Sequence, residues 1–270
     1  MSRLRIAALQ TGGTPGDAEE NLAELDDAAR RAAERGVELL LTPELFVTGY
    51  DIGERARRWS EQPLAARVGE VCRRRGIGVL AGIPEPVEGG IGNCATLVDE
   101  RGDVLARHVK AHLFGELDRD RFVPGGRLVT TVDFRGVRIA LLICYDVEFP
   151  EAVRAAAVAG AHLIAVPTAQ MTPFAFVADT VVPARAWENQ VYLAYANHVG
   201  QEAATVYIGR SCVVDPGGAV LARAEQEAAL LVADVDTEAV AAAQRRNPYL
   251  LDRRTDLYSP PRSEGSSDEL

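Results

Sequence analysis

The stretch Ile139-Ala140-Leu141-Leu142-Ile143-Cys144-Tyr145-Asp146-Val147-Glu148-Phe149-Pro150 begins as an unbroken apolar run and turns polar directly after its cysteine. An apolar run of this kind is typical of a strand that is buried on both faces of a sheet. Pro150 opens an alanine-rich segment, and proline suits the first turn of a helix. Cys144 is therefore expected where a buried strand leads into a helix, the edge at which open α/β sheets bind ligands.

Cys144 has two interpretations. A lone cysteine in an apolar strand is more often a small core residue than a reactive group. The partial positive charge of the nearby helix N-terminus, however, favours a thiolate and hence a nucleophile. Two other segments of the chain favour the nucleophile, because each places a polar residue of a suitable type at the end of a buried strand.

Glu44 and Lys110 are these residues. Glu44 follows the apolar run at 39–43, and Lys110 closes a strand predicted over 104–110. A thiol that opens a carbon–nitrogen bond needs a base to take its proton, and a carboxylate can do so. The oxyanion that forms needs a cation or N–H donors, which Lys110 and the backbone N–H of Tyr145 can supply. Taken alone, Glu44 and Lys110 are each more often solvated charges, and they are too distant in sequence for spacing to join them.

The chain as a whole predicts one α/β domain over residues 1–258. Segments 5–9 and 39–44, joined by a helix, are echoed by 138–142 and 163–168, which suggests two related sheets packed face to face with helices outside. We expect 247–258 to be an irregular tail that packs back on the domain, and 259–270 to be disordered. The predicted strands are 3–10, 37–42, 78–83, 93–99, 104–110, 128–134, 137–143, 163–166, 191–197, 210–214, 220–223 and 230–234. The predicted helices are 21–35, 63–75, 150–159, 178–190 and 237–246, and 111–127 is predicted to be a loop.

Composition excludes several classes of function. A net charge of −10 argues against a nucleic-acid partner and against an anionic membrane surface. The four cysteines form no C-x-x-C pair, and the four histidines show no H-E-x-x-H spacing, so neither a disulfide framework nor a metal site is expected. No signal peptide or long apolar span is evident, which predicts a reduced, cytoplasmic protein.

Three stretches together resemble the nitrilase, or carbon-nitrogen hydrolase, superfamily. They are Pro43-Glu44-Leu45-Phe46-Val47-Thr48-Gly49-Tyr50, Lys110-Ala111-His112-Leu113-Phe114 and Cys144-Tyr145-Asp146-Val147-Glu148-Phe149-Pro150-Glu151. The resemblance implies a four-layer α-β-β-α sandwich with two mixed sheets, and a Glu-Lys-Cys triad that needs no cofactor. Glu44 would be the general base, Lys110 would stabilise the tetrahedral intermediate, and Cys144 would form a thioester. Such proteins are usually homodimers or larger assemblies, and the same is expected here.

The resemblance also implies a fourth carboxylate in the loop after the lysine. Asp118 matches by spacing but departs from the usual glutamate, and Glu116 lies two residues away as an alternative. The cysteine segment is similar to the amidase-like branch, and neighbouring segments resemble bacterial stereoselective amidases that act on cyclic amino-acid carboxamides. The side chains expected to line the substrate pocket are those of Tyr50, Phe114, Tyr145, Ala169, Gln170 and Met171.

The expected activity is therefore cleavage of a small-molecule carboxamide to an acid and ammonia. Hydrolysis of an N-carbamoyl amine, which also yields carbon dioxide, is the main alternative, and a nitrilase is a further one. A nucleotide-binding loop at Gly12-Gly13-Thr14-Pro15-Gly16 lacks the lysine and spacing of such motifs, and Asp17 would repel phosphate. A non-catalytic binding module has no support while all three triad residue types are present.

Overall fold

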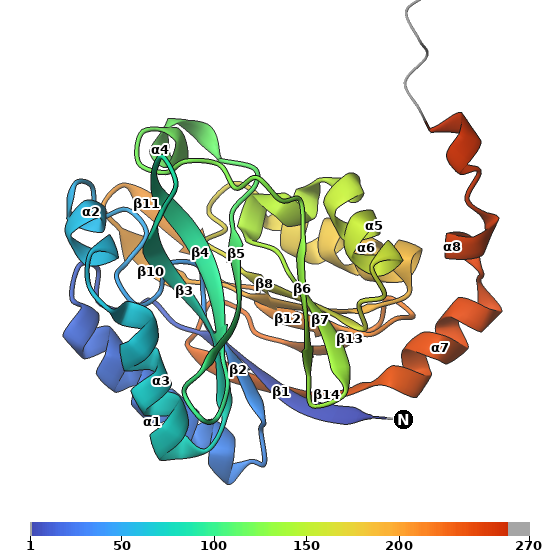
Figure 1. Cartoon of the computed structure of the whole chain (residues 1–270), viewed down its shortest axis with the longest axis horizontal. Helices are drawn as coiled ribbons and strands as arrows, with labels where there is room; N and C mark the ends of the chain where they lie inside the picture. Colours follow the sequence, from blue (N-terminus) through green and yellow to red (C-terminus); the bar gives the residue numbers. More distant parts are fainter. Residues whose placement is uncertain (1, 259–270) are drawn as a thin grey trace, which may run out of the picture.

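Two six-stranded sheets pack face to face with helices on both outer surfaces in the computed structural model, which describes residues 2–258 (Figure 1). This arrangement confirms the four-layer α-β-β-α sandwich with mixed sheets. The disorder predicted for 259–270 lies outside the described residues.

The first sheet has the strand order β14-β1-β2-β3-β4-β5. Its central strands β1, β2 and β3 are parallel, whereas β14, from the C-terminal part of the chain, pairs antiparallel with β1. The strands are β1 (Arg3–Gln10), β2 (Leu39–Leu41), β3 (Gly78–Val87), β4 (Gly90–Val98), β5 (Val104–Val109) and β14 (Ala229–Asp236).

The second sheet has the order β13-β12-β9-β8-β7-β6, with β7, β8 and β9 parallel. The parallel pairs β1/β2 and β7/β8 occupy equivalent places in the two sheets, which confirms the internal echo in the sequence. The strands are β6 (Thr130–Phe134), β7 (Val137–Leu141), β8 (Leu163–Pro167), β9 (Tyr192–Ala196), β12 (Cys212–Val214) and β13 (Val220–Arg223). A separate hairpin of β10 (Val199–Glu202) and β11 (Thr205–Ile208) was not expected.

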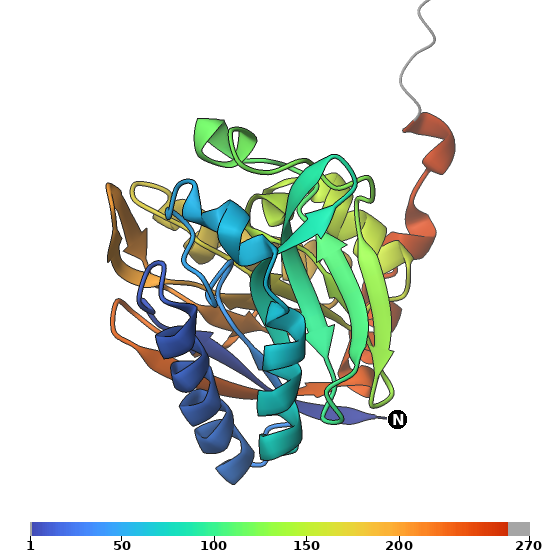
Figure 2. The same cartoon turned by 60° about the vertical axis from the view of Figure 1, so that its left-hand side comes forward.

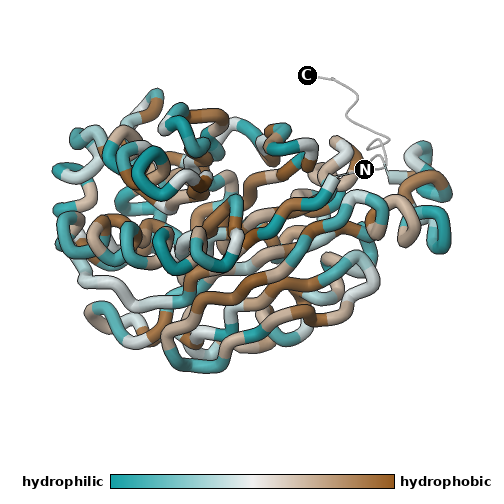
Figure 3. Tube along the Cα trace, turned by 90° about the horizontal axis from the view of Figure 1, so that it is seen from below, coloured by the Kyte–Doolittle hydropathy of each residue, from teal (hydrophilic) through white to brown (hydrophobic). Residues whose placement is uncertain are grey.

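Side chains that alternate between the two faces of each strand explain why the sheets are covered on both sides. Leu39 and Leu41 of β2 point into the core between the sheets, whereas Leu40 points into the core beneath the helices. Both faces of each central strand are thus covered, as parallel sheets require. Figure 3 shows hydrophobic residues concentrated on the strands.

Helices α1 (Ala18–Glu34) and α3 (Leu64–Arg75) cover the first sheet, and α5 (Pro150–Val158) and α6 (Val182–Asn189) cover the second (Figure 2). The Asp17 side chain accepts hydrogen bonds from the N–H groups of Glu19 and Glu20, both at 3.1 Å, and so caps the N-terminus of α1. The remaining helical elements are α2 (Arg55–Ser60), α4 (Gly115–Arg119), η1 (Cys144–Glu148), η2 (Val177–Val181), α7 (Thr237–Arg246), α8 (Tyr249–Asp252) and η3 (Thr255–Leu257).

Three local expectations are corrected. The predicted loop at 111–127 contains the short helix α4, and the helix predicted at 178–190 begins as the π-helix η2 before α6. The tail at 247–258 is not irregular, because it forms α8 and η3. Within this tail, Leu250 packs against the core around α5 and α6, whereas Leu251 is 86% exposed.

Residues 2–258 bear on the membrane, metal and redox expectations from the sequence. None of the helices there has both the length and the apolar character that crossing a bilayer requires. The four cysteines are free, and no cluster of three potential metal ligands is found in that range. The cytoplasmic location stays a prediction from the sequence.

Candidate active site

Glu44, Lys110 and Cys144 meet at the ends of three strands. Glu44 follows β2, Lys110 follows β5, and Cys144 begins η1 just after β7. The Lys110 Nζ atom lies 2.7 Å from Oε1 of Glu44. Glu44 and Lys110 are fully buried and Cys144 is only 7% exposed. None of the three is therefore a solvated surface charge or an ordinary exposed side chain.

The backbone of Glu44 is held by both sheets. A Cβ atom on Gly82 of β3 would lie 2.3 Å from the carbonyl oxygen of Pro43, so only glycine lets the Glu44 segment approach this strand. From the second sheet, the Thr168 carbonyl accepts the Glu44 N–H at 3.2 Å. His198 Nε2 donates to the Glu44 carbonyl at 2.7 Å. The base is thus fixed relative to the sheet that carries Cys144.

The two oxygens of the Glu44 carboxylate have different environments. Oε1 accepts hydrogen bonds from Lys110 and from Asn93 Nδ2, the latter at 2.6 Å. Oε2 is buried and has no hydrogen-bond partner among the described residues. Burial, together with the Asp118 carboxylate, raises the pKa of Glu44, although Lys110 and Asn93 oppose the shift. A buried oxygen without a donor is suited to accept a proton from a nearby group.

The structure separates the two candidates for the fourth carboxylate. Asp118 is fully buried, and its Oδ2 lies 2.6 Å from Lys110 Nζ. It also accepts hydrogen bonds from the Tyr50 hydroxyl at 2.8 Å and from the Phe114 N–H at 2.9 Å. Glu116 is exposed on α4. The helical turn at α4 explains this difference, because it directs Asp118 inward and leaves Glu116 on the outer side.

We expect Asp118→Asn to lower kcat by about 100-fold or more, because it removes one of the two charges that hold the lysine. Glu116→Gln should change kcat by less than about twofold, as expected for an exposed side chain. Steady-state amide hydrolysis by the two variants, with thermal unfolding as a check on folding, makes the comparison. A larger loss in the Glu116 variant would reverse the assignment.

Lys110 is the only lysine in the sequence; the other 28 of the 29 basic residues are arginines. Burial opposes its positive charge, but Glu44 and Asp118 outweigh burial and raise the pKa of Lys110 well above its ordinary value. The ammonium group has three hydrogens, of which Glu44 and Asp118 take two. The third is available to an oxyanion. This unique lysine is a sequence feature that identifies the position without any motif.

Cys144 lies in a strained backbone conformation, with φ at +44°. Burial and the Glu44 carboxylate raise the pKa of its thiol, and this outweighs Lys110, the Thr168 hydroxyl and the Ala169 N–H, which lower it. Burial therefore opposes the thiolate that the nearby helix N-terminus would favour. The geometry instead suits transfer of the thiol proton to Glu44 during attack.

Asp146 joins the cysteine turn to the lysine loop. Its carboxylate accepts the N–H of Ile143 at 3.1 Å and the N–H of His112 at 2.9 Å. His112 Nδ1 and His108 Nε2 also contact it, at 2.8 and 3.2 Å. The sequence did not reveal this role for Asp146. The two histidines four residues apart, together with a buried acid, are the features that could have indicated it.

The residues predicted to line the pocket fall into two groups. Tyr50, Ala169 and Gln170 are buried, whereas Phe114, Tyr145 and Met171 are partly exposed. The Tyr50 hydroxyl donates to Asp118. Phe114 packs edge-on against Tyr145, with ring centres 5.3 Å apart. Gln170 donates through Nε2 toward Glu148 at 3.4 Å. Met171 is half-buried and forms a β-bridge with Tyr207.

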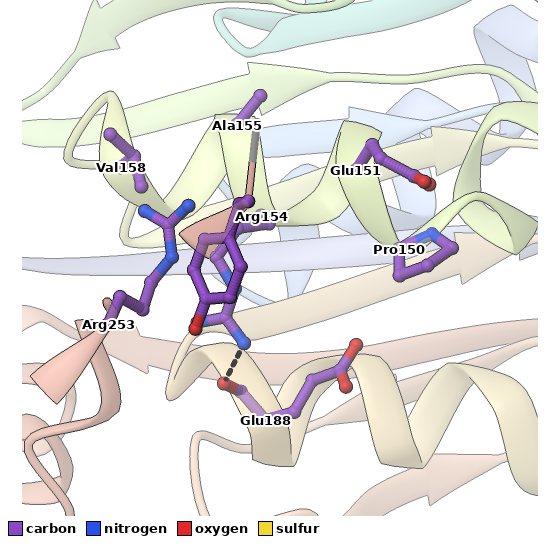
Figure 4. A pocket seen from close by; sticks show the side chains of 8 residues that line it. Pro150, Glu151, Arg154, Ala155, Val158, Glu188 and Arg253 are labelled. Carbon is purple, nitrogen blue, oxygen red and sulfur yellow. Dashed lines mark hydrogen bonds between the residues drawn. The ribbon is translucent and has the colours of Figure 1, made fainter. Parts of the chain in front are cut away.

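A surface groove of about 680 Å³ lies between α5, α6 and the C-terminal tail (Figure 4). Arg154 crosses it and donates to the Glu188 carbonyl at 2.8 Å. None of the predicted site residues lines this groove. A second cavity of about 550 Å³ is lined by Tyr145, Phe149 and residues of the loop after Lys110.

Comparison with known proteins gives a consistent result. The family model described as carbon-nitrogen hydrolase matches residues 5–245. An (R)-stereoselective amidase from Pseudomonas sp. is 36% identical, over 93% of this chain and 92% of its own length. The mouse omega-amidase is 32% identical over 95% of this chain and 96% of its own length.

Among solved structures, an amidase from Nesterenkonia sp. is 42% identical and superposes with a TM-score of 0.87, covering 95% of both chains. A variant of that amidase carries the acetamide moiety of fluoroacetamide on its active-site cysteine, and another has been solved with butyramide.

Proposed function

This chain belongs to the carbon-nitrogen hydrolase family, whose amidases cleave non-peptide carbon–nitrogen bonds, and from this premise we propose that it converts a small carboxamide to a carboxylic acid and ammonia. The observation that carries the proposal is the buried Oε2 atom of Glu44. It lacks a partner among residues 2–258, and it belongs to the carboxylate whose charge acts on the Cys144 thiol.

In the acylation step, the Cys144 sulfur attacks the amide carbonyl carbon while Glu44 Oε2 accepts the thiol proton. The third Nζ hydrogen of Lys110 and the Tyr145 N–H stabilise the oxyanion. As the carbon–nitrogen bond breaks, Glu44 returns the proton to the leaving nitrogen. Ammonia departs and a thioester on Cys144 remains.

In the deacylation step, Glu44 takes a proton from a water molecule that attacks the thioester carbonyl. The carbon–sulfur bond breaks, the thiol regains its proton, and the acid is released. The sum is one amide and one water converted to one acid and one ammonia. Glu44 must be ionised in both steps, and burial raises its pKa. As the pH is lowered, activity should therefore begin to fall at a higher pH than the ordinary pKa of a glutamate would give.

The test is a release assay on carboxamides, N-carbamoyl amines and nitriles, with Cys144→Ala as the blank. Ammonia from carboxamides without carbon dioxide, absent from the blank, is the expected result. Ammonia together with carbon dioxide from a carbamoyl compound would replace the proposal with the carbamoyl hydrolase alternative. Ammonia from nitriles alone would replace it with a nitrilase.

We further propose that two copies of the chain associate. Four apolar side chains along α5 and the C-terminal tail are exposed, namely those of Val158, Leu251, Leu257 and Tyr258. A second copy covering this face would remove them from water. Light scattering should give a mass of at least about twice the 29.0 kDa of one chain, and a mass near 29.0 kDa would reject the dimer.

A further inference from the structure

Glu148 places a carboxylate on the same short helix as the nucleophile. It ends η1, the short 3-10 helix that Cys144 begins. Residues three apart in such a helix are eclipsed, so Glu148 projects from the same face as Tyr145. Gln170 Nε2 contacts Glu148 Oε1 at 3.4 Å, and Gln170 directly follows Ala169, whose N–H acts to lower the pKa of the Cys144 thiol. Glu148 therefore borders the place where an acyl group would lie.

The Glu148 carboxylate is unpaired among the residues that the structure describes. Within residues 2–258 no lysine, arginine or histidine nitrogen forms an ion pair with it. Arg185 lies nearby, but its guanidinium donates to the backbone carbonyls of Val147 and Glu148, the latter at 2.8 Å, and its ion pair is with Glu188. The ion pairs of Lys110 are with Glu44 and Asp118. A half-buried carboxylate with one long hydrogen bond can gain considerably from a cation.

Three aromatic rings stand around the same region. Phe114 packs edge-on against Tyr145 and also against Phe174, with ring centres 5.3 and 5.9 Å apart. Gln170 Nε2, which contacts Glu148, also contacts the Phe174 carbonyl at 3.4 Å. Phe174 is 41% exposed, so this aromatic group reaches the surface. Aromatic faces together with a carboxylate form a favourable environment for an ammonium group.

We propose that Glu148 and the rings of Phe114, Tyr145 and Phe174 bind a protonated amine on the acyl part of the substrate, so that the preferred substrates are carboxamides bearing an ammonium group. The inference rests on the proposed amidase activity and names the class of substrate within it. Glu148 is a specificity residue in this proposal, and the reaction itself remains with Glu44, Lys110 and Cys144.

The test compares matched pairs of amides that differ only by replacing a terminal methyl group with an ammonium group. Glycinamide is paired with propionamide, β-alaninamide with butyramide, and 4-aminobutanamide with pentanamide. We expect kcat/KM to be about 10- to 100-fold higher for the ammonium member of at least one pair, and the best pair reports the distance from the carbonyl to Glu148.

Glu148→Gln keeps the size of the side chain and an oxygen that can accept from Gln170. In this variant the preference within the best pair should fall at least tenfold, through a larger loss on the ammonium amide than on its neutral partner. Glu151→Gln is the matched control, because Glu151 is exposed on α5 and lies three residues farther along. The control should retain the wild-type preference, and Glu148→Asp should retain part of it.

Each failure has a distinct meaning. If the wild-type protein hydrolyses the neutral amides but shows no preference in any pair, the amidase proposal stands and the role of Glu148 is rejected. If Glu148→Gln lowers both members of every pair equally, its role is structural or catalytic, and the inference is again overturned. If the wild-type protein hydrolyses no amide, the proposed function itself fails.

Discussion

Replacing Cys144 with alanine should abolish turnover, with a loss of at least about 10,000-fold in kcat, while the protein remains folded. The substitution removes the only atom that can form the thioester, and no other nucleophile lies in its place. Alanine is small and apolar, so the buried turn can accommodate it, and the thermal unfolding midpoint should change little. Ammonia release and a melting curve on the same preparation measure the two effects.

Cys212→Ala is the matched control for this experiment. Cys212 is also buried, but it lies on β12 in the core beneath α5 and α6, where no site residue is found. The control should lose some stability and keep its activity. Retained turnover in the Cys144 variant, or an equal loss in both variants, would contradict the role assigned to Cys144.

Replacing Lys110 with arginine should lower kcat by at least about 100-fold, even though the positive charge is kept. The ammonium fits between Glu44 and Asp118 with no exposure to solvent. A planar guanidinium is larger, and overpacking at a buried site costs about 1–3 kcal/mol of stability. We therefore expect both weaker catalysis and a lower unfolding midpoint.

The opposite substitution, arginine to lysine, at nearby Arg107 serves as the control. Arg107 lies on β5, the strand that Lys110 follows, and its partly exposed guanidinium pairs with Glu85 at 2.6 Å. Arg107→Lys should change kcat by less than about threefold, since a partly exposed pair contributes little. Near wild-type activity in the Lys110→Arg enzyme would show that the site needs only a positive charge. It would contradict the proposal that a compact ammonium donor is required.

Much of the fold could be predicted because local patterns agree with it. The apolar runs gave the central strands, β1, β13 and α7 end where the sequence predicts, and Asp17 begins α1 as a cap. The pairing of each strand with its neighbours was harder to predict from the sequence. The pairing of β14 with β1 joins residues more than two hundred positions apart, and no local pattern specifies such a contact.

The candidate site divides in the same way. Glu44, Lys110 and Cys144 could be picked out because they lie at the ends of predicted strands. The resemblance of three motifs to one family then assigned them to a single site. The choice between Asp118 and Glu116 depended on one turn of helix in a segment predicted to be a loop. The pocket lining expected from Tyr50, Phe114, Tyr145, Ala169, Gln170 and Met171 stays a prediction, and the structure adds that the Tyr50 hydroxyl donates to Asp118.

The sequence by itself determined the sandwich, the family and the three reactive residue types, because buried strands, caps and short motifs are local properties. Only the tertiary structure decided the burial that raises the pKa of the Cys144 thiol, and the lack of a basic partner for Glu148 within residues 2–258. Both depend on burial and on charges brought from distant strands, since the strength of an electrostatic interaction is set by separation in space and by exclusion of water.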